Sequence, residues 1–308
     1  EPEDVMHSSV TAYISIKKIG VIGLGLIGGS LAKALHSLAG IEHLLVADLN
    51  PESLARALAE GCVDETIDPA APNFVEAFDG CDVLFLCIPP HPACEMVKRF
   101  AKSNIGIISD VTSVKIPIMN ATAEMGNFIG GHPMAGSEGA GYAAADLNLF
   151  KNTTYVICVA ESCTLPPSHI EAYQRLVSAI GANPLFMDPV SHDCRVAVIS
   201  HLPHAAAFAL SCIVEESHDA TMRSLIGGGF RDTTRIAASS PALWTDIFSS
   251  SNHLATAIDE YVNKLCRIRD LLVEGNQEEL RDILKTASEF RASIPEGLHA
   301  SKHGGNAQ

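Results

Sequence analysis

The sequence predicts an α/β protein in which a doubly wound parallel sheet is followed by an all-helical domain. Three observations predict this fold class. Short apolar runs alternate with helix-like segments from Lys17 onward, which is the pattern of repeated βαβ units. A glycine-rich run directly follows the first of these strands, and strand-like runs stop at about residue 190. We therefore expect two domains of different class on one chain.

The elements of the first domain follow in order along the chain. Strands are predicted at 18–23, 43–48, 81–88, 105–111, 128–131, 155–160 and 184–188. Helices are predicted at 26–38, 51–60 and 167–180. Pro51 suits the first turn of its helix, because that turn needs no backbone N–H. Repeated strand–helix–strand units of this kind imply a parallel, doubly wound sheet.

The second domain is predicted from helical segments at 190–217, 254–274 and 277–293. Pro203 lies inside the first of these segments, where we expect a kink. At 308 residues and 47% hydrophobic content, the chain can bury two sizeable cores. The predicted organisation is a disordered lead at 1–16, a dinucleotide-binding domain at 17–190, a helical substrate and dimerisation domain at 191–294 and a frayed tail at 295–308.

Charge and composition argue against several classes of partner. The formal net charge is -15 and Lys and Arg do not cluster, so we do not expect binding of nucleic acid. No apolar run approaches the roughly 18 residues that a membrane span needs, and residues 1–16 lack the apolar core of a signal peptide. The cysteines show no Cys-x-x-Cys spacing, so we expect reduced thiols in a cytoplasmic protein.

A Gly-x-Gly-x-x-Gly run follows a predicted strand and opens a predicted helix, which is the context of a Rossmann-type dinucleotide loop. Gly23 permits the tight turn, Gly25 lets the backbone approach a pyrophosphate, and Gly28 lets the helix pack on the strand. Asp48 can accept hydrogen bonds from ribose hydroxyls and would repel a 2′-phosphate, so NAD is preferred over NADP. A glycine-rich turn without a ligand is the alternative. The candidate cofactor-binding residues are Gly23, Gly25, Leu26, Ile27, Gly28 and Asp48.

A titratable imidazole, His132, lies in a second glycine-lined segment at 130–136. Beside a nicotinamide, such a ring suggests hydride transfer with His132 as the general base. A surface turn that happens to contain a histidine is the alternative.

The predicted helical domain holds further polar candidates. His201 and His204 are three positions apart, so they share one face of a helix. A core histidine bonded to a backbone carbonyl would explain one such residue, whereas two on one face, with His192 upstream, favour a pocket. No cysteine or carboxylate lies at a suitable spacing on that face, so no metal is expected. Arg235 follows a glycine-rich entry and suggests a carboxylate clamp, with a surface salt bridge to Asp232 as the alternative.

These motifs together resemble the prephenate dehydrogenase family, whose members make 4-hydroxyphenylpyruvate on the route to tyrosine. They occur in family order between about Lys17 and Ser293, and they read GLGLIGGS at 23–30, DVTSVK at 110–115, GGHP at 130–133, SHLPH at 200–204 and GFRDTTRIA at 229–237. The resemblance implies an NAD(P) domain joined to a helical domain that builds a homodimer, with the active site between the two domains.

The resemblance also implies roles for individual residues. Prephenate carries a carbinol and two carboxylates, so its oxidation needs a base, a hydride acceptor and groups that bind carboxylates. By resemblance, His132 takes the hydrogen bond of the hydroxyl group and Ser113 orients it. His204 and Arg235 would hold the substrate carboxylates, with His201 supporting them.

Ser137 offers a further donor by the same resemblance. Four more residues are expected near the pocket as structural or polar-network residues: His192, Asp193, Asp232 and Trp244.

The expected activity is NAD-dependent oxidation of prephenate by a cytoplasmic homodimer. Arogenate carries an amine where prephenate carries a side-chain carbonyl, so one pocket residue could decide between the two substrates. A β-hydroxyacid dehydrogenase would need a lysine base on the first helix of the second domain, where this chain has His201 and His204. A non-enzymatic NAD-sensing protein would have no reason to keep Ser113, His132 and Arg235 together.

Overall fold

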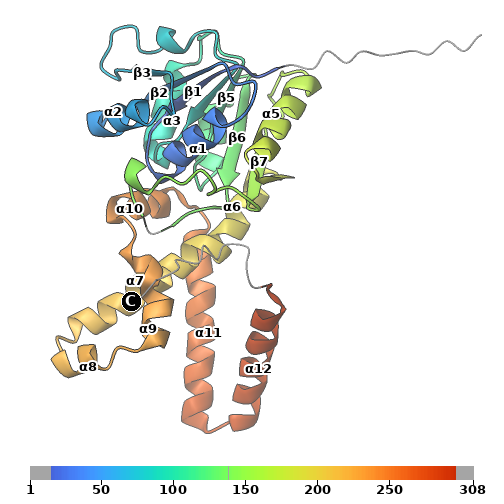
Figure 1. Cartoon of the computed structure of the whole chain (residues 1–308). Helices are drawn as coiled ribbons and strands as arrows, with labels where there is room; N and C mark the ends of the chain where they lie inside the picture. The colour runs from blue at the N-terminus through green and yellow to red at the C-terminus, as the bar shows by residue number, and fades with distance from the viewer. Residues whose placement is uncertain (1–14, 138, 296–308) are drawn as a thin grey trace, which may run out of the picture.

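The computed structural model describes residues 15–137 and 139–295 (Figure 1). Its first part is built on one eight-stranded sheet with the strand order β3-β2-β1-β4-β5-β6-β7-β8. The order reverses between β1 and β4, as in a doubly wound sheet. The strands are β1 (Lys18–Ile22), β2 (His43–Ala47), β3 (Glu65–Ile67), β4 (Val83–Leu86), β5 (Ile107–Asp110), β6 (Phe128–Pro133), β7 (Thr154–Val159) and β8 (Asn183–Phe186).

Helices cover both faces of the sheet, which is why its central strands can be apolar on both sides. On one face, α1 (Leu26–His36), α2 (Pro51–Ala59) and α5 (Pro167–Ala179) contribute to one hydrophobic core. On the other face, α3 (Pro90–Arg99) and α4 (Ile116–Ala121) contribute to a second core. The predicted fold class, an α/β sheet followed by helices alone, is confirmed.

The sheet differs from the fully parallel prediction at one place, because β7 pairs antiparallel with β6. A parallel return would need a crossover connection, usually a helix. Between β6 and β7 the described residues form only one short 3-10 turn, η2 (Tyr142–Ala144). The chain therefore turns back beside β6, and β8 then pairs parallel with β7.

The second part of the chain is helical. α6, the π-helical turn η3 and α7 follow one another as a single helix, with Pro203 in the first turn of α7. The widened turn η3 ends two residues before Pro203, the position where the sequence predicts a kink. The elements are α6 (Pro189–Val196), η3 (Ala197–His201), α7 (Leu202–Glu216), α8 (Ala220–Ser224), α9 (Gly228–Thr234), η4 (Arg235–Ala238), α10 (Pro241–Ser250), α11 (Leu254–Glu274) and α12 (Gln277–Ser293).

Figure 1 shows α11 and α12 side by side, joined by a tight turn. Gly275 ends α11 with a φ of +70°, a left-handed conformation that favours glycine. The predicted domain boundary after residue 190 falls in the first turn of α6. The predicted lead at 1–16 and tail at 295–308 lie outside the described residues, apart from positions 15, 16 and 295.

The helix Pro189–Glu216 is long and apolar enough to cross a membrane by length and composition, so the expectation that no such stretch exists is wrong. The sequence interpretation ended the apolar run at serines and histidines, but residues 196–214 contain no charged side chain. Core helices of proteins without a membrane span pass the same test, which makes the signal weak.

Polar contacts attach the helical part to the sheet edge that carries the strand carboxyl ends. Asp193 in α6 accepts hydrogen bonds from the backbone N–H groups of Lys115, at 2.7 Å, and Ile116, at 2.9 Å. Asp246 in α10 accepts one from the backbone N–H of His91, at 3.0 Å, and contacts the ring of the same histidine. The first turn of α3 and the segment that follows β5 therefore lie at the junction of the two parts.

Candidate active site

The glycine loop lies at the carboxyl end of β1, where the strand order reverses. Gly23 has a φ of +99°, and a Cβ at this position would lie 2.4 Å from the carbonyl oxygen of Cys87. A Cβ at Gly28 would lie 1.8 Å from the carbonyl oxygen of Gly23. Both positions therefore require glycine, as the sequence motif predicted.

Gly25 differs from its two neighbours, because nothing lies within 4 Å of a Cβ built there. It is the N-cap of α1, whose first turn contains no acidic side chain. The N–H groups of that turn, which includes Leu26 and Ile27, have no partner within the helix. Open space next to a partly positive helix end fits the pyrophosphate of a dinucleotide.

Asp48 follows β2 and holds the glycine loop in place. Its carboxylate accepts a hydrogen bond from the backbone N–H of Leu24, and one from Asn50 at 2.7 Å. The side chain is half-buried, so lone pairs remain for ribose hydroxyls. Asp48 thus has a structural task that the sequence did not predict, in addition to its predicted task of selecting the cofactor.

His132 lies in β6 with 8% of its surface exposed, so the alternative of a surface turn is wrong. The preceding Gly131 is held at both backbone groups. Its N–H donates to Asp110 at 3.1 Å, and its carbonyl oxygen accepts from the Lys115 ammonium at 2.6 Å. The position of the imidazole along the strand is fixed by these bonds.

Lys115 and Asp110 form an ion pair that is completely buried. The same ammonium group also donates to the hydroxyl of Thr112 at 3.2 Å. These bonds close the turn that carries Ser113 and tie it to β6. A buried charge persists only when it is paired and hydrogen-bonded, which explains why this turn is so densely connected.

The imidazole of His132 is linked to α6 through a second histidine. His132 Nδ1 lies 2.8 Å from His192 Nε2, and His192 Nδ1 lies 2.7 Å from an oxygen of Asp193. Burial holds the pKa of His132 well below its ordinary value, and unfavourable electrostatic interactions with His192, Lys115 and His201 oppose its protonation further. His132 is therefore a neutral ring at neutral pH, which is the form that can accept a proton.

Asp193 completes this chain of contacts. Burial alone would raise the pKa of Asp193, but hydrogen bonds from His192 and from the backbone of Lys115 and Ile116 hold it below its ordinary value. Asp193 is therefore an ionised carboxylate that can only accept hydrogen bonds.

His201 is buried beside the same cluster. Its Nδ1 lies 2.9 Å from the hydroxyl of Ser251, and its Nε2 is a buried atom without a hydrogen-bond partner among the described residues. Burial lowers the pKa of His201 to about 4. An unpaired polar atom in such a place favours a bound ligand over a satisfied core histidine.

His204 stacks on Trp244, with ring centroids 3.5 Å apart. Its Nδ1–H donates to the carbonyl oxygen of Ser200 at 3.0 Å. In the neutral ring, Nε2 then carries a lone pair and would repel a carboxylate. Burial lowers the pKa of His204, although the bond to Ser200 opposes this effect. His204 can therefore hold a carboxylate, as predicted, only after it takes up a proton.

The remaining predicted residues have different surroundings. Ser113 Oγ is buried and has no hydrogen-bond partner within the described residues, so it is available to a substrate hydroxyl. Ser137 is exposed beyond β6 and accepts a hydrogen bond from Gly139. Arg235 begins η4, which packs on α7, and it is exposed in the single chain, as is Asp232.

Two models of the prephenate dehydrogenase family match the chain. The nucleotide-binding domain matches residues 31–185, and the dimerization domain matches residues 188–286. Together they cover more than half of the sequence. This chain belongs to the prephenate dehydrogenase family. It is therefore an oxidoreductase, and the fold and the order of its motifs agree with that assignment.

Individual relatives agree with the family match. The prephenate dehydrogenase of Bacillus subtilis (strain 168) is 31% identical over 285 residues, which are 89% of this chain and 75% of the relative. A crystal structure of prephenate dehydrogenase from A. aeolicus, in complex with hydroxyphenyl propionate and NAD+, has a TM-score of 0.81 at 30% identity and covers 92% of this chain and 99% of its own. The arogenate dehydrogenase of Synechocystis has a TM-score of 0.72 at 28% identity, with 89% and 99% covered.

The structure reveals the importance for the candidate site of four residues for which the sequence predicted no specific role. Lys115 and Asp110 lie in the DVTSVK motif, which predicts no role for either residue, and His192 and Asp193 are expected from the sequence only as structural or polar-network residues. In each of these pairs, an aspartate lies close in the sequence to a lysine or a histidine, and this proximity was the available sequence signal. A sequence does not distinguish such a pair from an exposed one, because burial depends on the fold.

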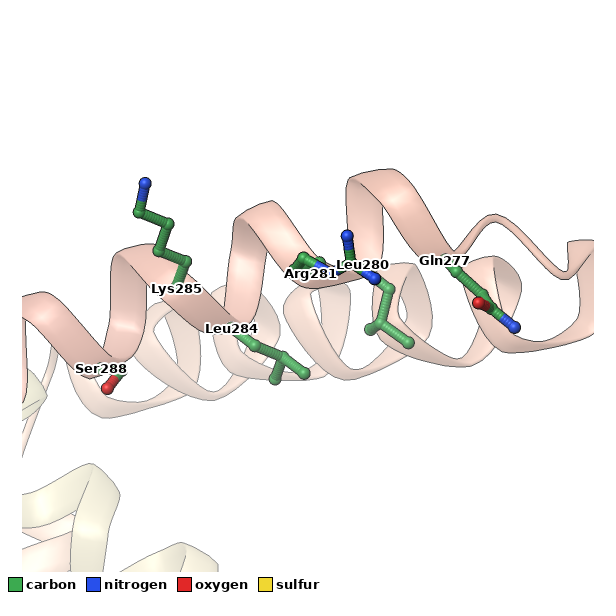
Figure 2. A pocket seen from close by; sticks show the side chains of 6 residues that line it. All are labelled: Gln277, Leu280, Arg281, Leu284, Lys285 and Ser288. Carbon is green, nitrogen blue, oxygen red and sulfur yellow. The ribbon is translucent and has the colours of Figure 1, made fainter.

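A shallow hollow of about 430 Å3 lies away from these elements, on α12 (Figure 2). Leu280 and Leu284 point to the same side of the helix. None of the predicted site residues lies in α12, so the hollow is separate from the candidate site. Its lining residues are Gln277, Leu280, Arg281, Leu284, Lys285 and Ser288.

Proposed function

We propose that this protein catalyses the NAD-dependent oxidative decarboxylation of prephenate to 4-hydroxyphenylpyruvate, with His132 as the general base. The observation that carries the proposal is the buried His132, whose Nδ1 is engaged by His192 and whose low pKa keeps the ring neutral. A buried neutral imidazole is the form that accepts a hydroxyl proton. The buried hydroxyl of Ser113, which lacks a partner among the described residues, supports a polar ligand here.

The proposed reaction begins at the C4 hydroxyl group of prephenate. His132 Nε2 takes the proton of the C4 hydroxyl group. The bound nicotinamide supplies a hydride acceptor for the hydrogen on C4, and a ring carbonyl results. The ring carboxylate then leaves as carbon dioxide, and the electron pair of the broken carbon–carbon bond completes the aromatic ring. The proton on His132 can return to the phenolate oxygen.

Substrate carboxylates are proposed to bind at the helical part. Arg235 supplies a permanent positive charge, and His204 supplies an N–H donor once it is protonated. A bound carboxylate would itself raise the pKa of His204, because a nearby negative charge stabilises the imidazolium ion. His201 lies three positions before His204 in the same helix, and its Nε2, a buried nitrogen without a described partner, can bond to the same ligand.

The cofactor is NAD. The open space at Gly25 and the free first turn of α1 support binding of the pyrophosphate. Asp48 supports NAD over NADP, because its carboxylate repels a 2′-phosphate.

The working form is proposed to be a homodimer in the cytoplasm. Apolar side chains of the helical part that are exposed in the single chain, such as Ile213 at 65% and Phe290 at 69%, would be covered by a second copy. The match to a dimerization domain over residues 188–286 supports this assembly. The nine cysteines are free thiols, which suits a reducing compartment.

Arogenate is the second candidate substrate, because a structurally similar relative is an arogenate dehydrogenase. Formation of NADH with prephenate and with arogenate should be measured in parallel on the full chain. A higher kcat/KM for prephenate supports the proposal. A higher kcat/KM for arogenate replaces it, and no turnover of either substrate with intact NAD binding would remove both candidates.

His132→Asn should lower kcat by about two to four orders of magnitude, because general-base catalysis typically contributes that much. NAD affinity should stay unchanged, since His132 is not part of the glycine loop. Steady-state kinetics with a separate NAD binding measurement tests both statements. A variant within about threefold of wild-type turnover would remove His132 from the mechanism, given the size of the usual contribution.

A further inference from the structure

Three buried side chains form a hydrogen-bonded chain from the helical part to the sheet. Asp193 and His192 lie next to each other in α6, and His132 lies in β6. Their exposed fractions are 3%, 0% and 8%. The rings of His132 and His192 meet edge to face, with centroids 5.0 Å apart. Buried contacts of this kind restrict the orientation of both rings.

The direction of each hydrogen bond follows from what each group can donate. The Asp193 carboxylate has no proton, and its oxygens already accept the backbone N–H groups of Lys115 and Ile116. The proton between Asp193 and His192 must therefore belong to His192 Nδ1. When His192 carries this single proton, its Nε2 is an acceptor. The proton of the next bond must come from His132 Nδ1, and His132 Nε2 keeps its lone pair.

We propose that His192 and Asp193 are positioning residues that hold His132 in the tautomer with the proton on Nδ1, so that Nε2 is the atom that accepts the substrate proton. This inference rests on the proposed function of His132 as the base. The other tautomer would place a proton on Nε2 and leave no lone pair there for the hydroxyl group. The second nitrogen of a functional histidine commonly determines the role of the first in this way.

The chain of bonds also has a consequence after proton transfer. When Nε2 has taken the hydroxyl proton, His132 carries a positive charge and still donates through Nδ1 to His192. The ionised Asp193 lies one ring further along and faces that charge through His192. A carboxylate placed in this way favours the imidazolium ion without itself taking up a proton.

Two substitutions at one position test the proposal. His192→Phe keeps a planar ring of similar size but removes the acceptor for His132 Nδ1–H. His192→Gln is the matched control, because its amide oxygen can accept the same proton. We expect His192→Phe to lower kcat by about 100-fold or more with little change in the KM for substrate, since a wrong tautomer is costly in other enzymes that depend on a histidine base. His192→Gln should restore most of the activity.

Nitrogen-15 NMR of the full-length protein, with labelled histidine, gives a readout that does not depend on activity. The signals of His132 are identified from their absence in His132→Asn. In the wild type and in His192→Gln, Nδ1 should be protonated and Nε2 unprotonated, and in His192→Phe the protonated nitrogen should shift towards Nε2. This measurement on the wild type is informative even if His192→Phe fails to fold.

The outcomes separate this inference from the function on which it rests. A wild-type His132 with its proton on Nε2, or equal activity in His192→Phe and His192→Gln, would overturn the positioning role. The expected tautomer in a protein that oxidises neither prephenate nor arogenate would instead overturn the proposed function and leave the hydrogen-bond assignment intact.

Discussion

In the sheet-bearing part of the molecule, α5 buries four residues against its neighbours, whereas α12 in the helical part buries none. The 15-residue α7 is similar to α12, since Ala207 is its single buried residue although most of its side chains are apolar. The first part thus encloses its own core, and the second exposes apolar surface that a single chain leaves uncovered. A folded protein seldom keeps such surface exposed without a partner. The stability of the two parts should therefore depend on different variables.

The largest effect is expected in the sheet-bearing part, at the buried ion pair. Lys115→Met should lower the free energy of unfolding by about 3–5 kcal/mol, because it leaves the Asp110 carboxylate buried and unpaired. Urea denaturation at several protein concentrations measures this change, and the loss should not depend on concentration.

Lys98→Met is the matched control for this prediction, because Lys98 forms an exposed pair with Glu95. Its effect should stay below about 1 kcal/mol. Similar losses in the two variants would mean that the buried pair contributes no more than a surface pair does.

The next effect is expected in the helical part, whose exposed apolar surface should make its stability depend on assembly. Ile213→Glu introduces a charge on the exposed apolar face of α7 and should raise the dimer dissociation constant by about 100-fold or more, since burial of one such side chain contributes about 1.5–3 kcal/mol on each subunit. Analytical ultracentrifugation measures this constant.

Leu58→Glu serves as the control in the sheet-bearing part, where Leu58 of α2 is 48% exposed. It should leave the dimer intact. Dissociation by Leu58→Glu, or a dimer unaffected by Ile213→Glu, would reverse the proposed difference between the two parts.

A third effect depends on pH and concerns the junction of the two parts. The pKa of His201 falls from 6.5 to about 4 on folding, so the unfolded chain takes up a proton first as the pH decreases. The stability contribution is constant above pH 6.5 and is lost as the pH falls towards 4, by about 3 kcal/mol at the lower limit. Chemical denaturation at a series of pH values should show a steeper decline for the wild type than for His201→Asn. Parallel declines would show that His201 is not the group that titrates.

The smallest effect concerns the glycine loop. Asp48→Ser should lower the ratio of kcat/KM with NAD to that with NADP by about tenfold or more, because the repulsion of a 2′-phosphate is removed. NAD affinity should also fall, since Leu24 and Asn50 lose the acceptor of their backbone N–H groups. Leu49→Ser, at a neighbouring position that is 91% exposed, is the control. If the cofactor preference of Asp48→Ser is unchanged, the role of Asp48 is structural only.

The sequence predicted the parts of the site whose determinants are local. The three glycines of the cofactor loop are close neighbours in the chain, and their steric requirements follow from one turn between a strand and a helix. The antiparallel β7 was not predicted, because strand direction depends on whether the connection between β6 and β7 crosses the sheet. Apolar strands of either direction have similar composition.

The fold class, the cofactor loop and the chemical type of the base follow from residue types at short spacings in the chain. The orientation of that base depends on tertiary contacts. His192 and His132 are 60 positions apart, and their hydrogen bond exists because Asp193 holds α6 to the backbone of Lys115 and Ile116 after β5. Tautomer, burial and pKa depend on what surrounds a ring in space, and that environment comes from segments that are distant in the sequence.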